Sequence, residues 1–189
     1  MNEHFKTFLD LSAELRPKHP ASLGKTLENK ESVFSSISGN IPLLFHVIYS
    51  NISGTRRDIK HQELMDFIPG YRLIHIDELT DENNNVASII DECNIEDVEI
   101  AIPFLADYSS NFICYVKHKN GNEGIYLLSN NDGELILKYK NGEDFLNTIS
   151  AFYRENVYFL DEDGYLDYDM EKESLVGANL NKGIKYWSE

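Results

Sequence analysis

The chain has 189 residues, of which 42% are hydrophobic and 12% are aromatic, so it can build one folded domain around a buried core. Its formal net charge of −15 argues against a nucleic-acid partner, and no apolar run approaches the ~20 residues of a membrane span. The N-terminal segment is charged and lacks the apolar stretch of a signal peptide, which favours a cytoplasmic location.

The sequence has no motif with the spacing of a catalytic or metal-binding site. Its six histidines are scattered, and no Walker loop or Gly-x-Ser-x-Gly motif occurs. Cys93 and Cys114 lie in apolar contexts outside any Cys-x-x-Cys pair, which favours buried free thiols over a disulfide or a metal pair. The acidic run at residues 161–164 resembles a calcium loop only in part, because its glycine comes too early. We therefore expect no metal and no cofactor.

The N-terminal segment predicts one helix followed by a loop. Apolar residues at helical spacing predict an amphipathic helix over residues 2–16, which Pro17 and Pro20 end. Residues 21–40 are mixed and polar, and they predict a loop with a short helical turn around residues 31–36.

The next segment predicts a helix, a strand and a second helix. An Ile-Pro pair at residues 41–42 opens the first helix, since proline is favoured where a helix starts, and this helix ends near residues 50–54. After a Pro-Gly turn, residues 71–76 alternate in part and predict a strand. Residues 77–93 place apolar side chains at helical spacing.

Four short apolar runs joined by tight turns predict an antiparallel meander. The runs cover residues 98–105, 112–116, 125–128 and 135–137. The Asn120-Gly121 pair between the second and third runs predicts a two-residue type I′ hairpin turn, which needs positive φ at both residues.

A helix and a short hairpin are expected after the meander. Asn141 is predicted to cap a helix over residues 143–155, whose first turn carries two acidic residues next to the positive end of the helix dipole. Residues 157–160 and 165–169 predict a hairpin around a tight turn.

The predicted fold class is α+β, with a central antiparallel β-meander sheet and helices packed mainly on one side. We expect an N-terminal helix and loop extension at residues 1–40, a main domain at 41–156, and an acidic hairpin and tail at 157–189, attached to the same domain. The part after residue 169 is polar and predicts a loosely attached tail with Trp187 as its only candidate anchor.

The negative charge is concentrated in the C-terminal part of the chain. Residues 1–70 are neutral overall, so the whole excess lies beyond them. Ten acidic residues and no Lys or Arg lie between Leu73 and Val116, and the segment from Glu155 to Glu171, with both ends counted, has seven acidic residues and no base. Such blocks attract basic partners and speed encounter with them, and a solubilising surface is the alternative interpretation.

Several motifs in combination resemble the SMI1/KNR4 or SUKH superfamily. The residues that carry the resemblance are Ile41-Pro42 with the helix that follows, Tyr71–Ile74, Ile76–Leu79, Ile102–Asp107, Asn111–Tyr115 and Ile149–Tyr153. The match extends over about residues 41–156, and Tyr108-Ser109-Ser110 replaces the Gly-rich turn that is usual in the family.

The resemblance implies a role in protein binding rather than in catalysis. Bacterial members of the superfamily are mostly immunity proteins that neutralise polymorphic toxins, many of them nucleases, and fungal members regulate cell-wall glucan synthesis through protein contacts. We therefore expect a non-enzymatic immunity protein that binds a basic toxin domain through an acidic surface. A regulatory protein-binding module without a toxin partner is the alternative, and an enzyme of unrecognised type is a third.

Eight residues at turns or in the acidic C-terminal block are the candidate contacts with a basic partner, because their side chains are expected to be exposed. They are Asp107, Tyr108, Asp132, Asp161, Glu162, Asp163, Asp167 and Asp169.

Overall fold

The computed structural model of the chain describes residues 1–130 and 132–188. The α-helices are α1 (Asn2–Leu15), α2 (His19–Ser22), α3 (Lys30–Ile37), α4 (Leu43–Asn51), α5 (Leu79–Glu92), α6 (Gly142–Arg154) and α7 (Met170–Leu180). The 3₁₀ helices are η1 (Gln62–Leu64), η2 (Ile76–Glu78) and η3 (Lys185–Trp187). The strands are β1 (Asp66–Ile68), β2 (Tyr71–Leu73), β3 (Val98–Ala106), β4 (Phe112–His118), β5 (Glu123–Ser129), β6 (Glu134–Tyr139), β7 (Tyr158–Leu160) and β8 (Leu166–Tyr168).

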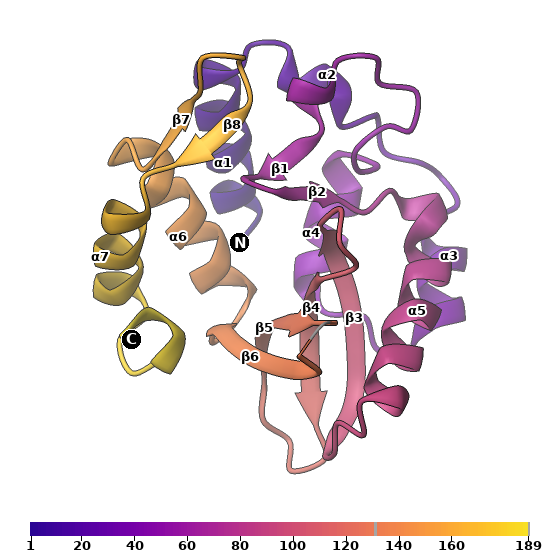
Figure 1. Cartoon of the computed structure of the whole chain (residues 1–189). Helices are drawn as coiled ribbons and strands as arrows, with labels where there is room; N and C mark the ends of the chain where they lie inside the picture. Colours follow the sequence, from indigo (N-terminus) through magenta and orange to yellow (C-terminus); the bar gives the residue numbers. More distant parts are fainter. Residues whose placement is uncertain (131, 189) are drawn as a thin grey trace.

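The strands β1 to β6 form one antiparallel sheet in which chain neighbours are also sheet neighbours. This sheet is a curled meander with helices around it, and the short β7–β8 hairpin stands apart from it (Figure 1). The α+β fold class and the four central strands are therefore confirmed. The strand β1 was not predicted, because a three-residue strand is too short to show a periodic pattern.

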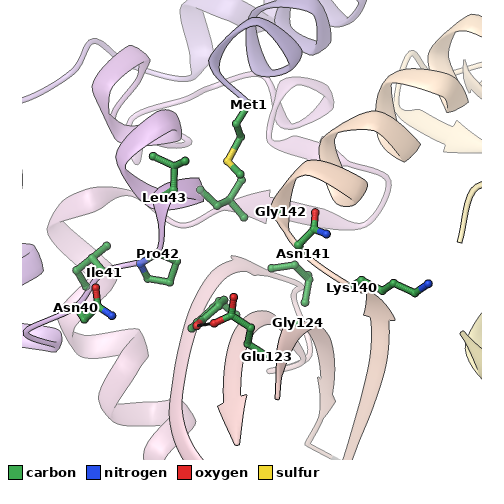
Figure 2. A pocket seen from close by; sticks show the side chains of 13 residues that line it. Met1, Asn40, Ile41, Pro42, Leu43, Glu123, Gly124, Lys140, Asn141 and Gly142 are labelled. Carbon is green, nitrogen blue, oxygen red and sulfur yellow. Dashed lines mark hydrogen bonds between the residues drawn. The ribbon is translucent and has the colours of Figure 1, made fainter. Parts of the chain in front are cut away.

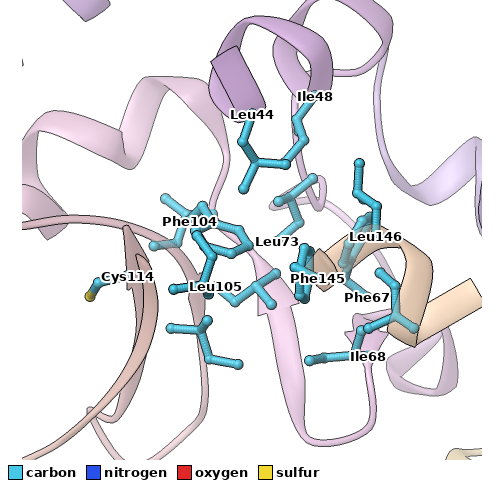
Figure 3. Packing of buried hydrophobic residues seen from close by; sticks show 14 of the residues in the cluster. Leu44, Ile48, Phe67, Ile68, Leu73, Phe104, Leu105, Cys114, Phe145 and Leu146 are labelled. Carbon is cyan, nitrogen blue, oxygen red and sulfur yellow. The ribbon is translucent and has the colours of Figure 1, made fainter. Parts of the chain in front are cut away.

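An aromatic core joins the sheet to two helices on one face. The ring centroid of Phe104 in β3 lies 5.8 Å from that of Phe45 in α4 and 5.3 Å from that of Phe145 in α6 (Figure 3). Helix α5 also packs against β3, and Ala87 of α5 lines a hollow together with Ala101 of β3. The helices thus pack around the sheet, which agrees with the predicted arrangement.

Helix α1 packs on the domain through fully buried phenylalanines. Phe5 and Phe8 have no exposed surface, and the ring of Phe8 lies 4.7 Å from that of Phe67 and 5.8 Å from that of Tyr153. Residues of all three expected segments therefore contribute to one hydrophobic cluster.

The predicted loop between the first two helices contains more helix than expected. Helix α3 covers the predicted helical turn, but the short helix α2 was missed. Pro20 lies in the first turn of α2, where its missing N–H is no loss, so it begins a helix there in addition to limiting the one before.

A buried polar cluster links α1 to the sheet edge and to α6. Arg16 is only 3% exposed, and its guanidinium donates to the Asp66 main-chain oxygen (2.6 Å), the Tyr153 hydroxyl (2.9 Å) and the Ser12 hydroxyl (3.1 Å). The Nδ1 atom of His19 lies 2.8 Å from the Ser12 hydroxyl. Burial, with a smaller contribution from the charge of Arg16, holds the pKa of His19 well below its ordinary value.

The prediction of a loosely attached C-terminal tail is wrong. Helix α7 packs on α6, and the chain then turns back so that Trp187, 6% exposed, contacts Tyr139 and Phe152 (Figure 1). The indole Nε1 donates to the Lys138 main-chain oxygen at 2.7 Å. The buried apolar side chains of this segment are Ile184 and Trp187, whereas Met170, Leu175 and Leu180 of α7 are exposed.

The hairpin at Asn120-Gly121 is confirmed, but its predicted type I′ turn is not. Gly121 has φ of +89°, whereas Asn120 is not among the residues with positive φ. The Gly121 N–H donates to the His118 carbonyl at 2.8 Å, so the central residues of the turn are Lys119 and Asn120. Glycine follows the turn in the left-handed position, as in three-residue hairpin loops.

We predict that Gly177→Ala destabilises the protein, although alanine is the better helix former. A Cβ atom at Gly177 would overlap the Trp187 ring, so we expect the free energy of unfolding to fall by about 1–3 kcal/mol. Urea denaturation is the measurement. Ser174→Ala, at an exposed position of the same helix, is the control and should change stability by less than about 0.5 kcal/mol. A stabilised Gly177→Ala variant would show that Trp187 does not pack there.

We also predict that the free energy of unfolding decreases as the pH is lowered below about 6.5, the ordinary pKa of histidine. The pKa of His19 is lowered in the folded state, so the unfolded chain takes up a proton that the folded chain does not bind. This difference removes about 1.4 kcal/mol per pH unit until the folded-state pKa is reached.

The check is denaturation at several pH values between about 5 and 8. The His19→Gln variant should lose most of the pH dependence of the free energy of unfolding. The His61→Gln variant, changed at an exposed histidine, should keep it. Equal slopes in the two variants would contradict the assignment to His19.

Candidate protein-interaction surface

The predicted contact residues lie in four places. Asp107 and Tyr108 are in the β3–β4 turn, Asp132 is in the β5–β6 turn, and Asp169 caps α7. The other four lie in the β7–β8 hairpin, which carries Asp161, Glu162, Asp163 and Asp167. The structure brings the β3–β4 turn and this hairpin to one hollow.

This hollow, of about 410 Å³, is lined by two tyrosines and by residues just before the β1–β2 turn. Its lining residues are Gln62, Met65, Asp66, Tyr108 and Tyr165. Tyr108 is 62% exposed and Tyr165 is 40% exposed, so both rings are accessible although they belong to different loops. We call this group of five residues the tyrosine hollow.

Hydrogen bonds fix the orientation of Tyr108 and Asp66. The Tyr108 hydroxyl donates to Asp66 Oδ1 at 2.9 Å, and Asp66 Oδ2 accepts from the Gly70 N–H at 2.9 Å. Partial burial of the phenol, together with this carboxylate, raises the pKa of Tyr108. An exposed aromatic side chain held in one orientation loses little entropy on binding.

More tyrosines extend the surface toward the C-terminus. Burial, aided by Asp107, Tyr186 and Tyr168, raises the pKa of Tyr71 to about 12. Tyr168 and Tyr186 are each 36% exposed. The surface is therefore aromatic as well as acidic, which suits protein recognition.

Asp107 has a structural role in its turn. Its Oδ1 accepts from the main-chain N–H groups of Ser109 (2.7 Å) and Asn111 (2.8 Å), and its Oδ2 accepts from the Asn111 side-chain amide (2.7 Å). These bonds hold Ser110 at φ of +63°, which is costly for a residue with a Cβ. Both oxygens of the Asp107 carboxylate thus already accept hydrogen bonds within the turn.

Some acidic residues of the C-terminal hairpin have a structural role like that of Asp107, and others have no partner within the described chain. Asp161 accepts from the N–H groups of Asp163 (3.0 Å) and Tyr165 (2.8 Å), and it closes the turn. Asp167 Oδ1 accepts from the next N–H in the chain at 2.8 Å. Glu162 and Asp163 are exposed and form no ion pair within the described residues, so their charges are available to a partner.

Two predicted contacts lie neither in the β3–β4 turn nor in the β7–β8 hairpin, and of all eight only Tyr108 lines the tyrosine hollow. Asp169 accepts from the Lys172 N–H at 3.0 Å as the N-cap of α7, and its Oδ2 lies 3.6 Å from the Lys172 ammonium. Asp132 accepts from the Ser129 hydroxyl at 2.9 Å. The β5–β6 turn meets the β3–β4 turn through the Asn130 N–H, which donates to Asn111 Oδ1 at 3.0 Å.

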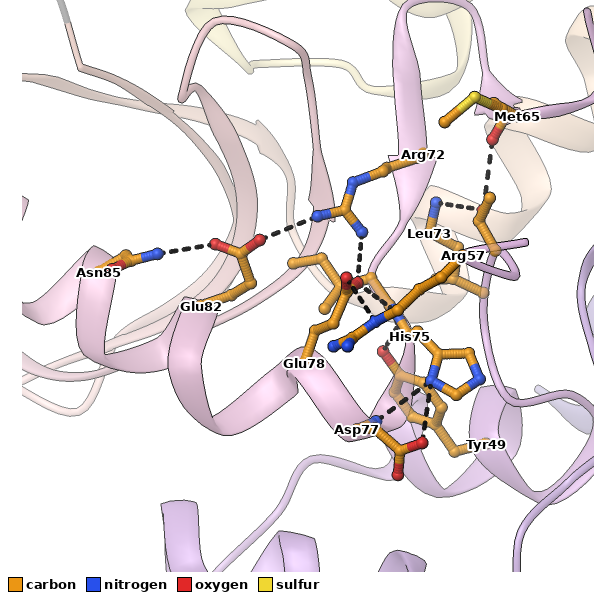
Figure 4. Close-up of polar contacts among 12 residues, drawn as sticks. Tyr49, Arg57, Met65, Arg72, Leu73, His75, Asp77, Glu78, Glu82 and Asn85 are labelled. Carbon is orange, nitrogen blue, oxygen red and sulfur yellow. Dashed lines mark hydrogen bonds and ion pairs between the residues drawn. The ribbon is translucent and has the colours of Figure 1, made fainter. Parts of the chain in front are cut away.

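The other acidic block is partly neutralised within the chain. Arg72 donates to Glu78 (2.6 Å) and Glu82 (2.9 Å), and Arg57 lies 2.9 Å from Glu78 (Figure 4). Lys117 similarly pairs with Glu99 at 2.9 Å. The sequence did not reveal these pairs, because their partners are far apart in the chain or on different elements.

A second hollow, of about 240 Å³, lies between α4, β5 and the start of α6 (Figure 2). Two of its polar side chains already have partners within the chain: Asn141 Oδ1 accepts from the N–H groups of Glu143 and Asp144, and the Tyr115 hydroxyl donates to Glu123 at 2.6 Å. The predicted N-cap at Asn141 is thereby confirmed, and the tyrosine hollow is the stronger candidate site.

Three further findings concern metal ions, cysteines and membrane-spanning helices. The described residues include no group of three or more His, Cys, Asp or Glu side chains that could hold a metal ion. Both cysteines are free thiols, with Cys114 buried and Cys93 half-buried, and burial raises the pKa of Cys114. Within residues 1–130 and 132–188, no helix has both the length and the apolar character needed to cross a membrane.

Comparison with known proteins adds no relative: no protein-family model matches the chain, and a search of curated proteins gives no match. The interpretation of the surface therefore depends on its geometry. Sequence reasoning missed Asp66, Met65 and Tyr165, and only the turn at Pro69-Gly70 hinted that Asp66 lies at an exposed hairpin.

We predict that the acidic residues differ sharply in their effect on stability. Asp107→Ala leaves three donors without a partner and should lower the free energy of unfolding by about 1–3 kcal/mol. Glu162→Ala should change it by less than about 0.5 kcal/mol. Chemical denaturation of both variants is the test, and equal small effects would contradict the structural role of Asp107.

Proposed function

We propose that the chain is an immunity protein of the SUKH type, which binds and neutralises a basic toxin domain without catalysing a reaction. The observation that carries the proposal is the tyrosine hollow beside an acidic hairpin. Tyr108 and Tyr165 offer exposed rings, and Glu162 and Asp163 offer carboxylates without partners in the described chain. Tyrosine is enriched in protein interfaces, and a negative rim speeds encounter with a positive partner.

The distribution of charge supports this choice of surface. Arg57, Arg72 and Lys117 compensate part of the first acidic block, whereas Glu162 and Asp163 at the hairpin tip form no ion pair in the described structure. A nuclease toxin binds phosphates and so presents a basic surface, which an acidic inhibitor can cover. The resemblance of several motifs to those of the SUKH superfamily favours the same role.

Affinity capture followed by co-expression tests the proposal. The tagged chain is used to capture proteins from its native lysate at low and at high salt, and each captured protein is then expressed alone and together with the chain. We expect a small basic domain that arrests growth when expressed alone and is harmless in the presence of the chain. A captured partner that is harmless alone, such as a regulator of cell-wall synthesis, would contradict the immunity role.

Charge reversal at the hairpin tip gives a second prediction. Glu162→Lys combined with Asp163→Lys should slow association with the captured domain about 10-fold at low salt and reduce its salt dependence. Asp161 is left unchanged because its carboxylate closes the turn. The melting temperature should stay constant, because both replaced side chains are exposed.

The matched control places the same charge change in the other acidic block. Asp91→Lys combined with Glu96→Lys alters two exposed residues near the start of β3, at the opposite end of that strand from the β3–β4 turn. Stopped-flow or biosensor association rates compare the two variants. Equal slowing would mean that net charge alone matters and that the hairpin is not the contact surface.

A further inference from the structure

We propose that the tyrosine hollow is a receptor for one arginine side chain of the partner. This inference rests on the proposed function, because it names the group of a basic protein that the surface would bind. It follows from three features of the hollow: aromatic walls, a carboxylate with free acceptor capacity, and a rigid frame.

The walls of the hollow suit a flat cation. Tyr108 and Tyr165 line it from two different loops, and Met65 adds an apolar side chain to the lining. A guanidinium packs against aromatic rings because their faces carry negative potential, and it is more weakly hydrated than an ammonium group. An apolar residue of a partner would also fit such walls, but it would leave the carboxylate of Asp66 without compensation.

The carboxylate of Asp66 has room for two more hydrogen bonds. Its Oδ1 accepts one bond from the Tyr108 hydroxyl and its Oδ2 accepts one from the Gly70 N–H, whereas an ionised carboxylate offers about four acceptor positions. One position on each oxygen matches the two parallel N–H groups of a guanidinium. Arginine therefore fits this site better than lysine, which cannot donate in a parallel pair.

Arg16, the buried cation at the end of α1, leaves this capacity unused. Arg16 donates to the main-chain oxygen of Asp66, at 2.6 Å, and no ion pair to the Asp66 carboxylate occurs in the described structure. The carboxylate is thus oriented by neutral donors and keeps its charge for a ligand.

The frame of the hollow exists before any ligand binds. Asp161 accepts the Tyr165 N–H at 2.8 Å, and the Asp161 N–H donates to the Tyr165 carbonyl at 3.0 Å, which fixes the backbone that carries this ring. Asp107 holds the turn that carries Tyr108. Two of the predicted contact residues therefore act on the site as positioning residues and not as contacts.

The test uses three blocked tripeptides, Gly-Arg-Gly, Gly-Lys-Gly and Gly-citrulline-Gly, titrated into the full chain labelled with ¹⁵N. Citrulline has nearly the shape of arginine but no charge. We expect the arginine peptide to cause saturable shifts of the amide signals of Gly70, Tyr108 and Tyr165. We expect the citrulline peptide to bind at least ~10-fold more weakly and the lysine peptide at least ~3-fold more weakly.

Variants locate the binding. Tyr165→Ala should weaken the arginine peptide ~3- to 10-fold through loss of one wall, and Asp66→Asn should weaken it ~10-fold or more. Glu96→Gln removes an exposed carboxylate elsewhere and should have no effect. The amide spectrum of each variant shows whether it remains folded, and Tyr165→Ala tests the hollow even if Asp66→Asn disturbs its turn.

Each contrary result overturns the proposal. Equal binding of the citrulline peptide would show that charge is not recognised, and equal binding of the lysine peptide would remove the preference for arginine. Shifts outside the hollow, or none, would exclude a receptor at this place. A captured toxin that the chain neutralises equally well with Tyr165→Ala and Asp66→Asn would keep the immunity role and reject the arginine receptor.

Discussion

A buried guanidinium links the sheet edge beside the tyrosine hollow to the core. Arg16, at the end of α1, donates to a main-chain oxygen of the edge strand β1 and to the Tyr153 hydroxyl of α6. Arg16 thereby connects α1 to β1 at the sheet edge and to α6 in the core. The residue whose oxygen it binds is Asp66, and the carboxylate of Asp66 lies in the tyrosine hollow. The position of the surface therefore depends on a polar contact made in the interior, where an unpaired charge is costly.

The acidic residues of this chain differ in what they do, although the sequence presents them alike. Asp107, Asp161 and Asp169 accept main-chain N–H groups and shape turns or a helix start. Glu78 and Glu82 compensate Arg72. Among the described residues, exposed carboxylates without an ion-pair partner, such as Glu162 and Asp163 at the hairpin tip, give the surface its unpaired negative charge. In the proposed binding role, specificity is expected from the ordered tyrosines, because charge alone steers a partner without fixing its orientation.

Local patterns were sufficient to predict much of the fold. The strands β3 to β6 combine apolar runs with turn residues, and Asn141 has the local chemistry of an N-cap, so these elements could be predicted. The C-terminal segment was misjudged because its docking depends on Trp187, whose partners Tyr139 and Phe152 lie far away in the chain. Averaged polarity carries no information about such contacts.

The site was less predictable than the fold. Tyr108 was found because it lies in a short turn, and the hairpin acids were found by their charge. Asp66 and Tyr165 were not, because the hollow exists only where three separated segments meet. The structural role of Asp107 had a local signal, since an aspartate that begins a Ser-rich turn commonly accepts main-chain N–H groups two residues on.

The most direct measurement of the central claim is hydrogen exchange of the chain with and without its captured partner. The account predicts that the partner slows exchange in residues 62–72, 107–112 and 161–168, the three segments around the tyrosine hollow. Exchange in residues 91–99, in the other acidic block, should stay unchanged. Protection confined to residues 91–99, or to the surface between α4 and β5, would contradict the assignment of the tyrosine hollow as the binding site.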